Sequence, residues 1–230
     1  MNKVKSISLM FPLYKDRSTV KLMIKKSVKV LKKLKKKYEI IIVDDGCPQN
    51  SGKLAKEISK KYSNVKVFFH KKNLGYGAAL KTGFKKFKND WIFMIDGDNE
   101  YDVNDLFRLV KASENYDLVI TYRYKKKYTT SRILISWIYN AILRLIFNLK
   151  FRDISTGSRF VSRKLVKRIK LRSNSPFVGA ELAIKAELAG YKVSEIGIHT
   201  YPRTFGTGSS VSFKNILLTL KDMFLLFLRI

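Results

Sequence analysis

Apolar runs of strand length alternate with longer amphipathic stretches over the first half of the chain, and this alternation constrains the fold more than any other feature. Five such runs are present: SISLMF, EIIIV, VKVFF, WIFMI and DLVIT. The stretches between them, at 18–38, 51–62, 76–88 and 103–114, are long enough to form helices. This pattern predicts an α/β fold with a parallel sheet covered by helices on both faces, in which ligands bind beyond the carboxyl ends of the strands.

The rest of the chain predicts fewer strands. We expect a helix at 131–149, a loop at 151–160, a helix at 178–189, a strand near 192–198, a loop at 203–210 and a last apolar helix from about 213. With 230 residues, 46% of them hydrophobic, the chain has enough apolar material for the core of one large domain or of a domain with a modest appendage. No internal repeat or long linker divides it.

The chain is strongly basic, with 47 Lys and Arg against 18 Asp and Glu and a formal net charge of +29. This excess predicts attraction to an anionic partner, which could be nucleic acid, a phospholipid surface or a phosphorylated small molecule. A solvated helix face is the alternative for Lys-rich stretches such as 25–38. A nucleic-acid-binding module has little support beyond the charge, because no RRM, KH or zinc signature is present.

Cysteine use and hydropathy bear on the compartment. Cys47 is the only cysteine, which excludes an intramolecular disulfide and is typical of a reducing compartment. The first apolar stretch ends at Pro12, too early for a signal peptide. No segment reaches the roughly 18 uninterrupted apolar residues of a membrane-spanning helix. We therefore expect a protein of the cytosol or of the cytosolic side of a membrane.

Scarce acids crowd together after the run WIFMI, in the segment MIDGDNEYD. On an extended backbone Asp96 and Asp98 project to one side, where their carboxylates repel each other unless a cation lies between them. Mg²⁺ suits such a pair, because it commonly takes one or two protein carboxylates and fills its other positions with water and phosphate oxygens. The alternative is a polar turn whose acids cap a helix starting near Val103, above all for Asp102. A calcium-binding helix-loop-helix is excluded, because Tyr101 stands where that loop requires Gly.

A second acidic strand end and a glycine-containing loop accompany this cluster. The run EIIIV delivers Asp44 and Asp45 onto a turn at Gly46, and Asp45 could accept hydrogen bonds from a nucleobase or ribose. Gly75 and Gly77 stand ahead of a helix start, where free N–H groups favour an anion. The spacing matches neither a Walker A loop nor G-x-G-x-x-G, so its position between two acidic loops is what gives it meaning.

Six motifs in order, FPLYKD, VDDG, KNLGYGAALKTGF, MIDGDNEYD, DISTGSRFVSR and YPRTFGTGSS, cover nearly the whole chain. Together they resemble the family 2 glycosyltransferases of GT-A fold, especially the dolichol-phosphate mannose synthase-like branch that charges polyprenyl phosphates. The resemblance implies a Rossmann-like, mostly parallel sheet with amphipathic interface helices. It also implies a nucleotide-sugar-binding half at 1–125, an acceptor-binding half at 126–212 and a membrane-associating helix at 213–230.

The resemblance further implies roles for single residues. It makes Asp96-Gly97-Asp98 a D-x-D motif, in which Asp96, Asp98 and Glu100 hold Mg²⁺ or Mn²⁺. It places Arg123 and Arg132 against phosphates. The nucleotide-sugar site it implies comprises Pro12, Tyr14, Asp16, Asp44, Asp45, Gly46, Lys72, Asn73, Gly75, Gly77, Asp96 and Gly97. The chain departs from the family pattern at Lys15-Asp16, where Asn-Glu is usual, and at Cys47, where Ser is usual.

The acceptor decides whether the reaction needs a base. A sugar hydroxyl must lose a proton, and Asp153 and Glu181 are the candidates to take it. A lipid phosphate is already anionic and needs no base. Groups that suit an anionic acceptor are Ser155, Gly157, Arg159, Arg203, Ser209 and Ser210. We expect a metal-dependent, inverting hexosyltransferase that acts on a polyprenyl phosphate. Transfer to a glycan hydroxyl and a catalytically inactive interaction protein are the alternatives.

Two helices predict contact with a membrane surface. Helix 131–149 carries a narrow polar stripe on an otherwise apolar cylinder, and the segment 213–230 shows the same habit. Such helices either fill a core or lie in a membrane interface. Trp137 and Tyr139, with the flanking Lys125 to Lys127, favour the interface, and Lys214, Lys221 and Arg229 of the second segment could reach anionic headgroups. We expect a peripheral protein at the cytosolic face of a membrane, held there directly or by a membrane-anchoring partner subunit.

Overall fold

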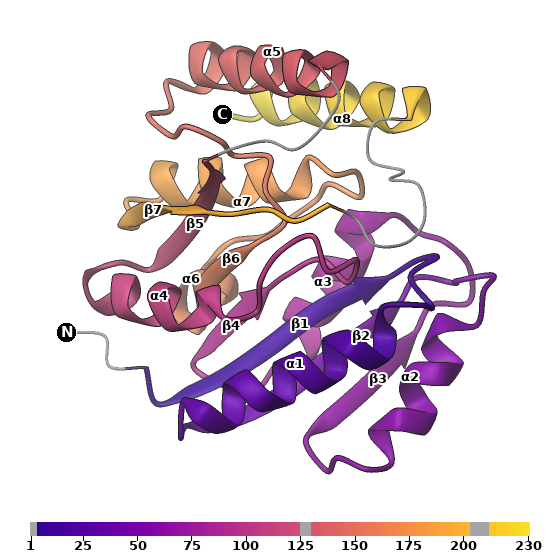
Figure 1. Cartoon of the computed structure of the whole chain (residues 1–230). Helices are drawn as coiled ribbons and strands as arrows, with labels where there is room; N and C mark the ends of the chain where they lie inside the picture. Colours follow the sequence, from indigo (N-terminus) through magenta and orange to yellow (C-terminus); the bar gives the residue numbers. More distant parts are fainter. Residues whose placement is uncertain (1–3, 125–129, 203–211) are drawn as a thin grey trace.

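The computed structural model describes residues 4–124, 130–202 and 212–230, without the side chain of Arg132. Seven strands form one sheet in the order β3-β2-β1-β4-β6-β5-β7 (Figure 1). The strands are β1 Ser6–Leu13, β2 Lys37–Asp44, β3 Val65–Phe69, β4 Trp91–Met94, β5 Leu118–Arg123, β6 Arg159–Ser162 and β7 Val193–Ile198. The helices are α1 Val20–Lys33, α2 Ser51–Ser59, α3 Tyr76–Lys86, α4 Asp105–Ala112, α5 Thr130–Phe147, α6 Arg163–Arg168, α7 Val178–Leu188 and α8 Phe213–Phe227, with a 3₁₀ turn η1 at Ser113–Asn115.

The centre of the sheet is built from the apolar runs of the first half. Strand β1 lies between β2 and β4 and is parallel to both, with Met10 opposite Ile41 on one side and Met94 on the other. Nearly every residue of these three strands is buried, because helices cover both faces of the sheet. Continuous apolar runs, rather than alternating ones, are what such doubly covered strands require. The predicted mostly parallel α/β fold is confirmed.

Strand β6 corrects the expected loop at 151–160. Arg159–Ser162 runs antiparallel between β4 and β5, with Phe160 opposite Phe93 and Val119. Only four residues pair in this strand, and Arg159 and Ser162 flank the two apolar ones, so the segment lacked the longer apolar run that marked the other strands. Helix α6, which follows at once, was also not predicted. The sheet thus joins β5, which ends before the expected boundary at 125, to β6, which follows it.

Two apolar clusters fill the two faces of the sheet. Helices α1, α2 and α4 contribute side chains such as Met23, Ala55 and Leu106 to one cluster. Helices α3 and α7 provide most of the helical side chains of the other, together with Leu165 of α6. Both clusters reach the strands that deliver the acidic segments, so the loops at the carboxyl ends of these strands stand on a packed base.

Helices α5 and α8 lie side by side at one end of the molecule, at the top in Figure 1, and a shallow groove between their ends is lined by residues of both. Asn140 and Leu143 of α5, and Met223 and Leu226 of α8, are buried, and Tyr139, Ile142 and Phe147 of α5 pack partly buried against the core. Most other apolar residues of both helices are exposed. Of the helices in the described ranges, none has the length and hydropathy needed to cross a membrane.

Candidate active site

The acidic loops meet at one edge of the sheet because β1, β2 and β4 are parallel neighbours. Backbone bonds continue past the strand ends: the Asp45 N–H donates to the Leu13 carbonyl at 3.0 Å, and the Ile95 N–H to the Met10 carbonyl at 3.0 Å. Since β6 is antiparallel, its first residue, Arg159, lies at this same edge, opposite Met94. The predicted gathering of Asp45, Asp96 and their loops is therefore a direct result of strand order.

Asp96 is held by a tyrosine that the sequence did not single out. The Tyr76 hydroxyl, from the first residue of α3, donates a hydrogen bond of 2.7 Å to Asp96 Oδ1. Burial, followed by the nearby carboxylate of Asp98, raises the pKa of Asp96 to about 7, although the bond from Tyr76 and the charge of Arg159 oppose this rise. Burial and the adjacent Asp96 also raise the pKa of Tyr76 well above its ordinary value. Asp96 therefore lies in a site that disfavours its negative charge unless a cation is added.

Asp98 and Glu100 lie close to Asp96, and both are buried. The Glu100 N–H donates to Asp98 Oδ1 at 3.0 Å, which fixes the turn of the acidic segment. Both carboxylates contribute to the raised pKa of Asp96, so all three interact electrostatically. Across the described ranges, however, no three His, Cys, Asp or Glu side chains form a ready-made metal cluster. Hard carboxylate oxygens under mutual repulsion fit a divalent cation whose remaining ligands come from phosphate and water.

Asp45 organises the glycine loop that precedes α3. Its carboxylate accepts hydrogen bonds from the N–H groups of Leu74 and Gly75, both at 2.9 Å. His70 Nδ1 lies 2.7 Å from Asp45 Oδ1, and His70 Nε2 lies 2.8 Å from the Thr82 hydroxyl. The His70 ring thus ties Asp45 to α3. His70 was not predicted as a site residue, because its only signal in the sequence was a position directly after β3.

Asp44, the other acid of this pair, is used at the start of α2. Its two oxygens accept hydrogen bonds from the N–H groups of Cys47 and Gly52, each at 2.7 Å. A Cβ at position 52 would lie 2.0 Å from Asp44 Oδ2, so only glycine allows this approach. Asp44 therefore caps a helix in this structure, and its predicted part in nucleotide-sugar binding stays a prediction.

The glycines of the 72–77 loop serve close packing. Gly75 has φ +96°, a conformation that favours glycine, and its N–H is taken by Asp45. The Gly77 N–H donates to the Asn174 carbonyl at 2.8 Å, and a Cβ at position 77 would lie 2.5 Å from the Ser173 carbonyl oxygen. The N–H groups of Gly75 and Gly77 themselves are therefore not free, and the expected anion site at the helix start stays a prediction. Gly46, with φ +64°, allows its turn to pack against the Lys72 backbone.

Arg123 and Asp153 form a buried ion pair. Arg123 Nε and Nη2 donate to the two oxygens of Asp153 at 2.7 and 3.1 Å, and Nη2 also donates to the Ser155 hydroxyl at 2.6 Å. Asn140 of α5 donates to Asp153 Oδ1 at 3.2 Å and accepts from the Ile154 N–H. Asp153 is thus paired with Arg123, which does not favour its expected role as a base. Part of the polar stripe of α5 faces this network.

Glu181 is also committed to the fold. Its carboxylate accepts from the N–H groups of Arg172 and Ser173 and from Lys185 Nζ, one turn further along α7. Burial opposes the charge, but the hydrogen bond from Lys185 and those from the 172–173 backbone lower the pKa of Glu181 below its ordinary value. Glu181 therefore holds the segment that packs against Gly77, which does not favour its expected role as a base.

Of the residues expected to bind the acceptor, some are described by the structure and others lie outside the described ranges. Arg159 is 2% exposed, and its guanidinium packs against Gly179 and donates to the Ile154 carbonyl, so it does not face an acceptor. Its Nε has no hydrogen-bond partner within the described ranges. Ser155 joins the Arg123 network, and Gly157 packs against Asp96. Arg203, Ser209 and Ser210 lie outside the described residues, and Arg132 is placed by its backbone alone.

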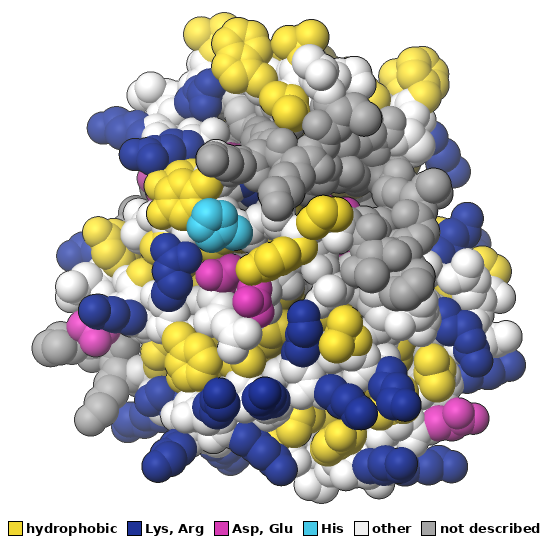
Figure 2. All heavy atoms as spheres, viewed as in Figure 1, with side chains coloured by type: hydrophobic (Ala, Val, Ile, Leu, Met, Phe, Trp, Pro, Cys, Tyr) yellow, Lys and Arg dark blue, Asp and Glu magenta, His cyan; other side chains and the backbone are white. Residues whose placement is uncertain are grey.

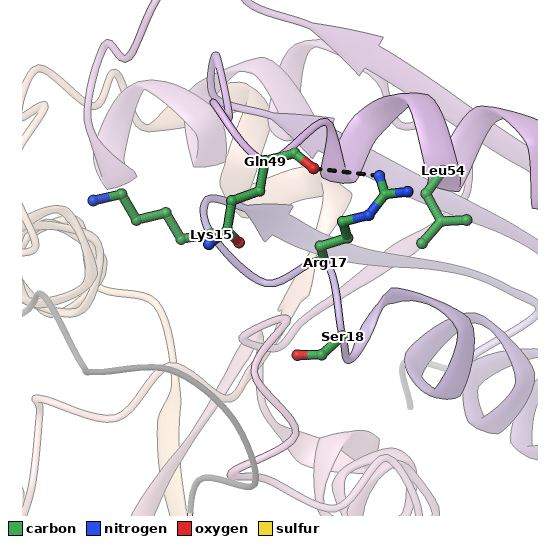
Figure 3. A pocket seen from close by; sticks show the side chains of 5 residues that line it. All are labelled: Lys15, Arg17, Ser18, Gln49 and Leu54. Atoms are coloured by element: carbon green, nitrogen blue, oxygen red, sulfur yellow. Dashed lines mark hydrogen bonds between the residues drawn. The ribbon is translucent and has the colours of Figure 1, made fainter.

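The remaining residues expected to bind the donor line the same edge. Pro12, Tyr14 and Asp16 follow or end β1, and the Pro12 carbonyl oxygen would lie 2.6 Å from a Cβ at position 97, so Gly97 must be glycine for the two loops to meet. Lys72 and Asn73 are exposed. Beside these loops lies an open hollow of about 700 Å³ lined by Lys15, Arg17, Ser18, Gln49 and Leu54 (Figure 3). Arg17 Nη1 donates to the Gln49 and Asn50 carbonyls at 3.2 and 3.0 Å.

Solved structures share this architecture. Glucosyl-3-phosphoglycerate synthase from Mycobacterium tuberculosis in complex with phosphoglyceric acid has a TM-score of 0.71 at 17% identity, covering 95% of this chain and 80% of that chain. The same enzyme with Mn²⁺, UDP-glucose and phosphoglyceric acid has a TM-score of 0.68 at 17% identity, covering 95% and 79%. A structure described only as a mycobacterial protein has a TM-score of 0.73 at 15% identity, covering 95% and 74%.

The sheet, its covering helices and the acidic strand ends define the class of protein: an α/β protein with the GT-A fold of glycosyltransferases. The sequence itself then fixes the family. The family model described as glycosyl transferase family 2 matches residues 8–170, most of the chain. The chain belongs to glycosyl transferase family 2 and is a glycosyltransferase, as the six ordered motifs indicated.

Proposed function

We propose that the chain transfers a hexosyl group from a nucleotide-diphosphate sugar to a polyprenyl phosphate, with inversion, at the cytosolic face of a membrane. Within its family this corresponds to the dolichol-phosphate mannose synthase-like branch. The observation that carries the lipid acceptor is the apolar face of α5 and α8. Trp137 is 62% exposed, Leu145 86% and Phe213 76%. Contiguous exposed apolar surface of this kind marks a contact with membrane or protein.

The donor half of the proposal rests on the acidic edge of the sheet. Asp98, with Asp96 and Glu100 beside it, would hold Mg²⁺ or Mn²⁺. That cation would supply Lewis-acid stabilisation of the charge that develops on the leaving diphosphate. Asp45 and the loop at 72–77 border the same edge and would contact the nucleoside. Solved complexes of the structurally similar synthase, which contain Mn²⁺ and UDP-glucose, support a cation and a nucleotide sugar as ligands.

The commitments of Asp153 and Glu181 support an anionic acceptor. An acceptor hydroxyl needs a base to remove its proton, whereas a phosphate monoester oxygen is already charged. Both acids that the sequence offered as bases are buried in ion pairs, with Arg123 and Lys185. A phosphate acceptor makes such a base unnecessary.

Charge around the apolar face supports a bilayer with anionic lipids. Hydrophobic side chains gather along the top of the molecule in Figure 2, over α5 and α8, and Lys and Arg side chains lie beside and below them. Lys214 and Lys221 of α8 are exposed, as is Arg229 just after it. Juxtaposed apolar and basic surface binds anionic membranes by burial and by attraction to the headgroups.

The test is a transfer assay with radiolabelled sugar nucleotides and a short-chain polyprenyl phosphate. We expect an organic-extractable, mild-acid-labile product that requires a divalent cation. The Asp98→Ala variant serves as the inactive control. Absence of lipid-linked product with every donor, together with transfer to another acceptor, would contradict the lipid assignment and leave the glycosyltransferase assignment in place.

A soluble phosphorylated acceptor is the second candidate. It is favoured by the likeness to an enzyme that was crystallised with phosphoglyceric acid. The shared chemistry is a phosphate group near the sugar-transfer site. Adding 3-phosphoglycerate to the same assay separates the two candidates, because its glucosylated product stays in the aqueous phase.

A further inference from the structure

The hydrogen bond from Tyr76 to Asp96 joins two loops that are far apart in the sequence. Tyr76 begins α3 and belongs to the glycine loop, whereas Asp96 follows β4. The phenol donates to Asp96 Oδ1 at 2.7 Å in a partly buried setting. A single side chain therefore connects the loop next to Asp45 with the acidic segment.

The backbone around Tyr76 leaves little freedom for this contact to change. On one side, Gly75 donates to Asp45 Oδ2 at 2.9 Å. On the other, Gly77 donates to the Asn174 carbonyl at 2.8 Å. Lys81, one turn later in α3, donates to the Asn174 side chain at 2.6 Å. The ring of Tyr76 is thus anchored from both ends of the turn that carries it.

Asp96 is confined on its other side as well. A Cβ at position 157 would lie 2.0 Å from Asp96 Oδ2, so the carboxylate sits directly against the Gly157 backbone. With Oδ1 bound by Tyr76 and Oδ2 packed on Gly157, the carboxylate has one orientation. Any movement of the glycine loop is transmitted to it through the phenol.

We propose that Tyr76 is a positioning residue that makes the glycine loop and the acidic segment respond as one unit, so that nucleoside diphosphate and divalent cation bind cooperatively. The inference rests on the proposed nucleotide-sugar site. Without the phenol, each loop would bind its own ligand while the extra coupling between them falls. Coupling between two ligands is reciprocal, so it is measurable from either one.

The test is isothermal titration of UDP and of GDP into the full chain, with and without MnCl₂, for wild type and Tyr76→Phe. We expect Mn²⁺ to tighten nucleotide binding in the wild type, and this enhancement to fall by roughly fivefold or more in the variant. Nucleotide affinity without Mn²⁺ should fall by a smaller factor than the enhancement does. Tyr139→Phe is the matched control, because Tyr139 also feels the charge of Arg159 but lies on α5.

Each outcome separates this inference from the proposed function. If wild type binds neither nucleotide at any Mn²⁺ concentration, the donor site and the inference fail together. If wild type binds with Mn²⁺ enhancement and Tyr76→Phe retains the full enhancement, only the inference fails. Equal weakening of binding with and without Mn²⁺ would also overturn it, since Tyr76 would then support the loop without coupling the ligands. Melting temperatures of both variants check that the fold is retained.

Discussion

Acidic side chains in this basic chain fall into two groups according to what their oxygens contact. Those of Asp44, Asp45 and Glu181 accept hydrogen bonds from backbone N–H groups of nearby loops. Asp98 also accepts one such bond, from the Glu100 N–H, but Asp96 and Asp98 lie close enough for their repulsion to disfavour the charge of Asp96. Carboxylates of the first group stabilise the conformations of the loops whose N–H groups they accept. We expect a bound divalent cation to relieve the repulsion within the second group.

Removal of Asp98 should abolish transfer with little effect on folding. In Asp98→Ala we expect turnover to fall by about 10²–10³-fold, the size of effect seen when a group that stabilises developing charge is lost. Loss of the hydrogen bond from the Glu100 N–H is offset by relief of the repulsion with Asp96. Kinetic assays check the loss of turnover, and thermal melting of the metal-free protein checks that the fold is retained. Asp102→Ala, in the same segment, is the control that should keep its activity.

Asp96 should make the metal-free protein less stable as pH rises. Its folded-state pKa, about 7, lies above its ordinary value, so the folded state holds a proton that the unfolded state has lost between about pH 4 and pH 7. Stability therefore falls through this window. In Asp96→Asn, unfolding in urea with EDTA should show this fall removed and a gain of about 2 kcal/mol near pH 8, less than the full shift implies because solvent reaches part of the side chain. If the stability of the wild type and that of the variant changed with pH in the same way, the raised pKa of Asp96 would be contradicted.

At the scale of structural elements, the short segment 172–175 contacts several parts of the fold that are distant in the sequence. Glu181 of α7 holds its first N–H groups, Asn174 accepts from Gly77, and the Ser175 N–H donates to Asp222 of α8 at 3.2 Å. One irregular stretch thus connects the glycine loop to two helices of the second half. The placement of Tyr76 depends on it.

Replacing Glu181 should destabilise this arrangement in a pH-dependent way. Glu181→Gln removes a carboxylate that accepts from Lys185 and two N–H groups, and we expect a loss of about 2 kcal/mol near pH 7. Because the folded-state pKa of Glu181 is lowered, its contribution is complete above its ordinary pKa and is lost as pH falls through the lowered value. The difference between wild type and variant, measured by urea unfolding, should therefore narrow below about pH 4. Glu187→Gln, an exposed acid on the same helix, should show no such difference.

Long apolar runs made the strands of the first half predictable, and strand order then brought Asp45 and Asp96 to one edge. Strand β6 escaped prediction because its four residues obtain their stability from β4 and β5, which are distant in the sequence. The roles of Asp153 and Glu181 escaped for a related reason. A carboxylate with no partner nearby in the sequence looks available, and the partners Arg123 and Ser173 become visible only when the chain is folded.

At the scale of the whole molecule, the apolar face formed by α5 and α8 leads to a prediction that can be tested directly. Both helices leave large side chains such as Leu145 and Phe224 in solvent, while the attachment to the core uses few buried residues. The predicted membrane contact stays a prediction. This prediction requires that the face of α5 and α8, and not the Lys-rich face of α1, contributes most of the affinity for vesicles.

Vesicle sedimentation distinguishes the two faces. Leu145→Ser with Phe224→Ser should reduce binding to vesicles that contain anionic lipid by about tenfold or more, because complete burial of each large apolar side chain contributes about 1.5–3 kcal/mol and a tenfold change corresponds to about 1.4 kcal/mol. Transfer to a short-chain, water-soluble acceptor should be retained. Lys25→Ser with Lys29→Ser on α1 is the charge control. Loss of soluble-acceptor transfer in the double apolar variant would indicate a structural role instead.

The place of β6 between β4 and β5 also sets an order in which the protein is completed as it leaves the ribosome. Strands β1 to β4 are contiguous in the sequence and neighbours in the sheet, so they are able to pair as soon as residue 94 has emerged. Strand β5 is synthesised next but has no native partner among them, since the position beside β4 in the finished sheet belongs to residues 159–162. Until those residues emerge, this edge is open to pairing with other chains. A nascent chain halted between residues 125 and 158 is therefore the form that we expect to depend most on chaperones.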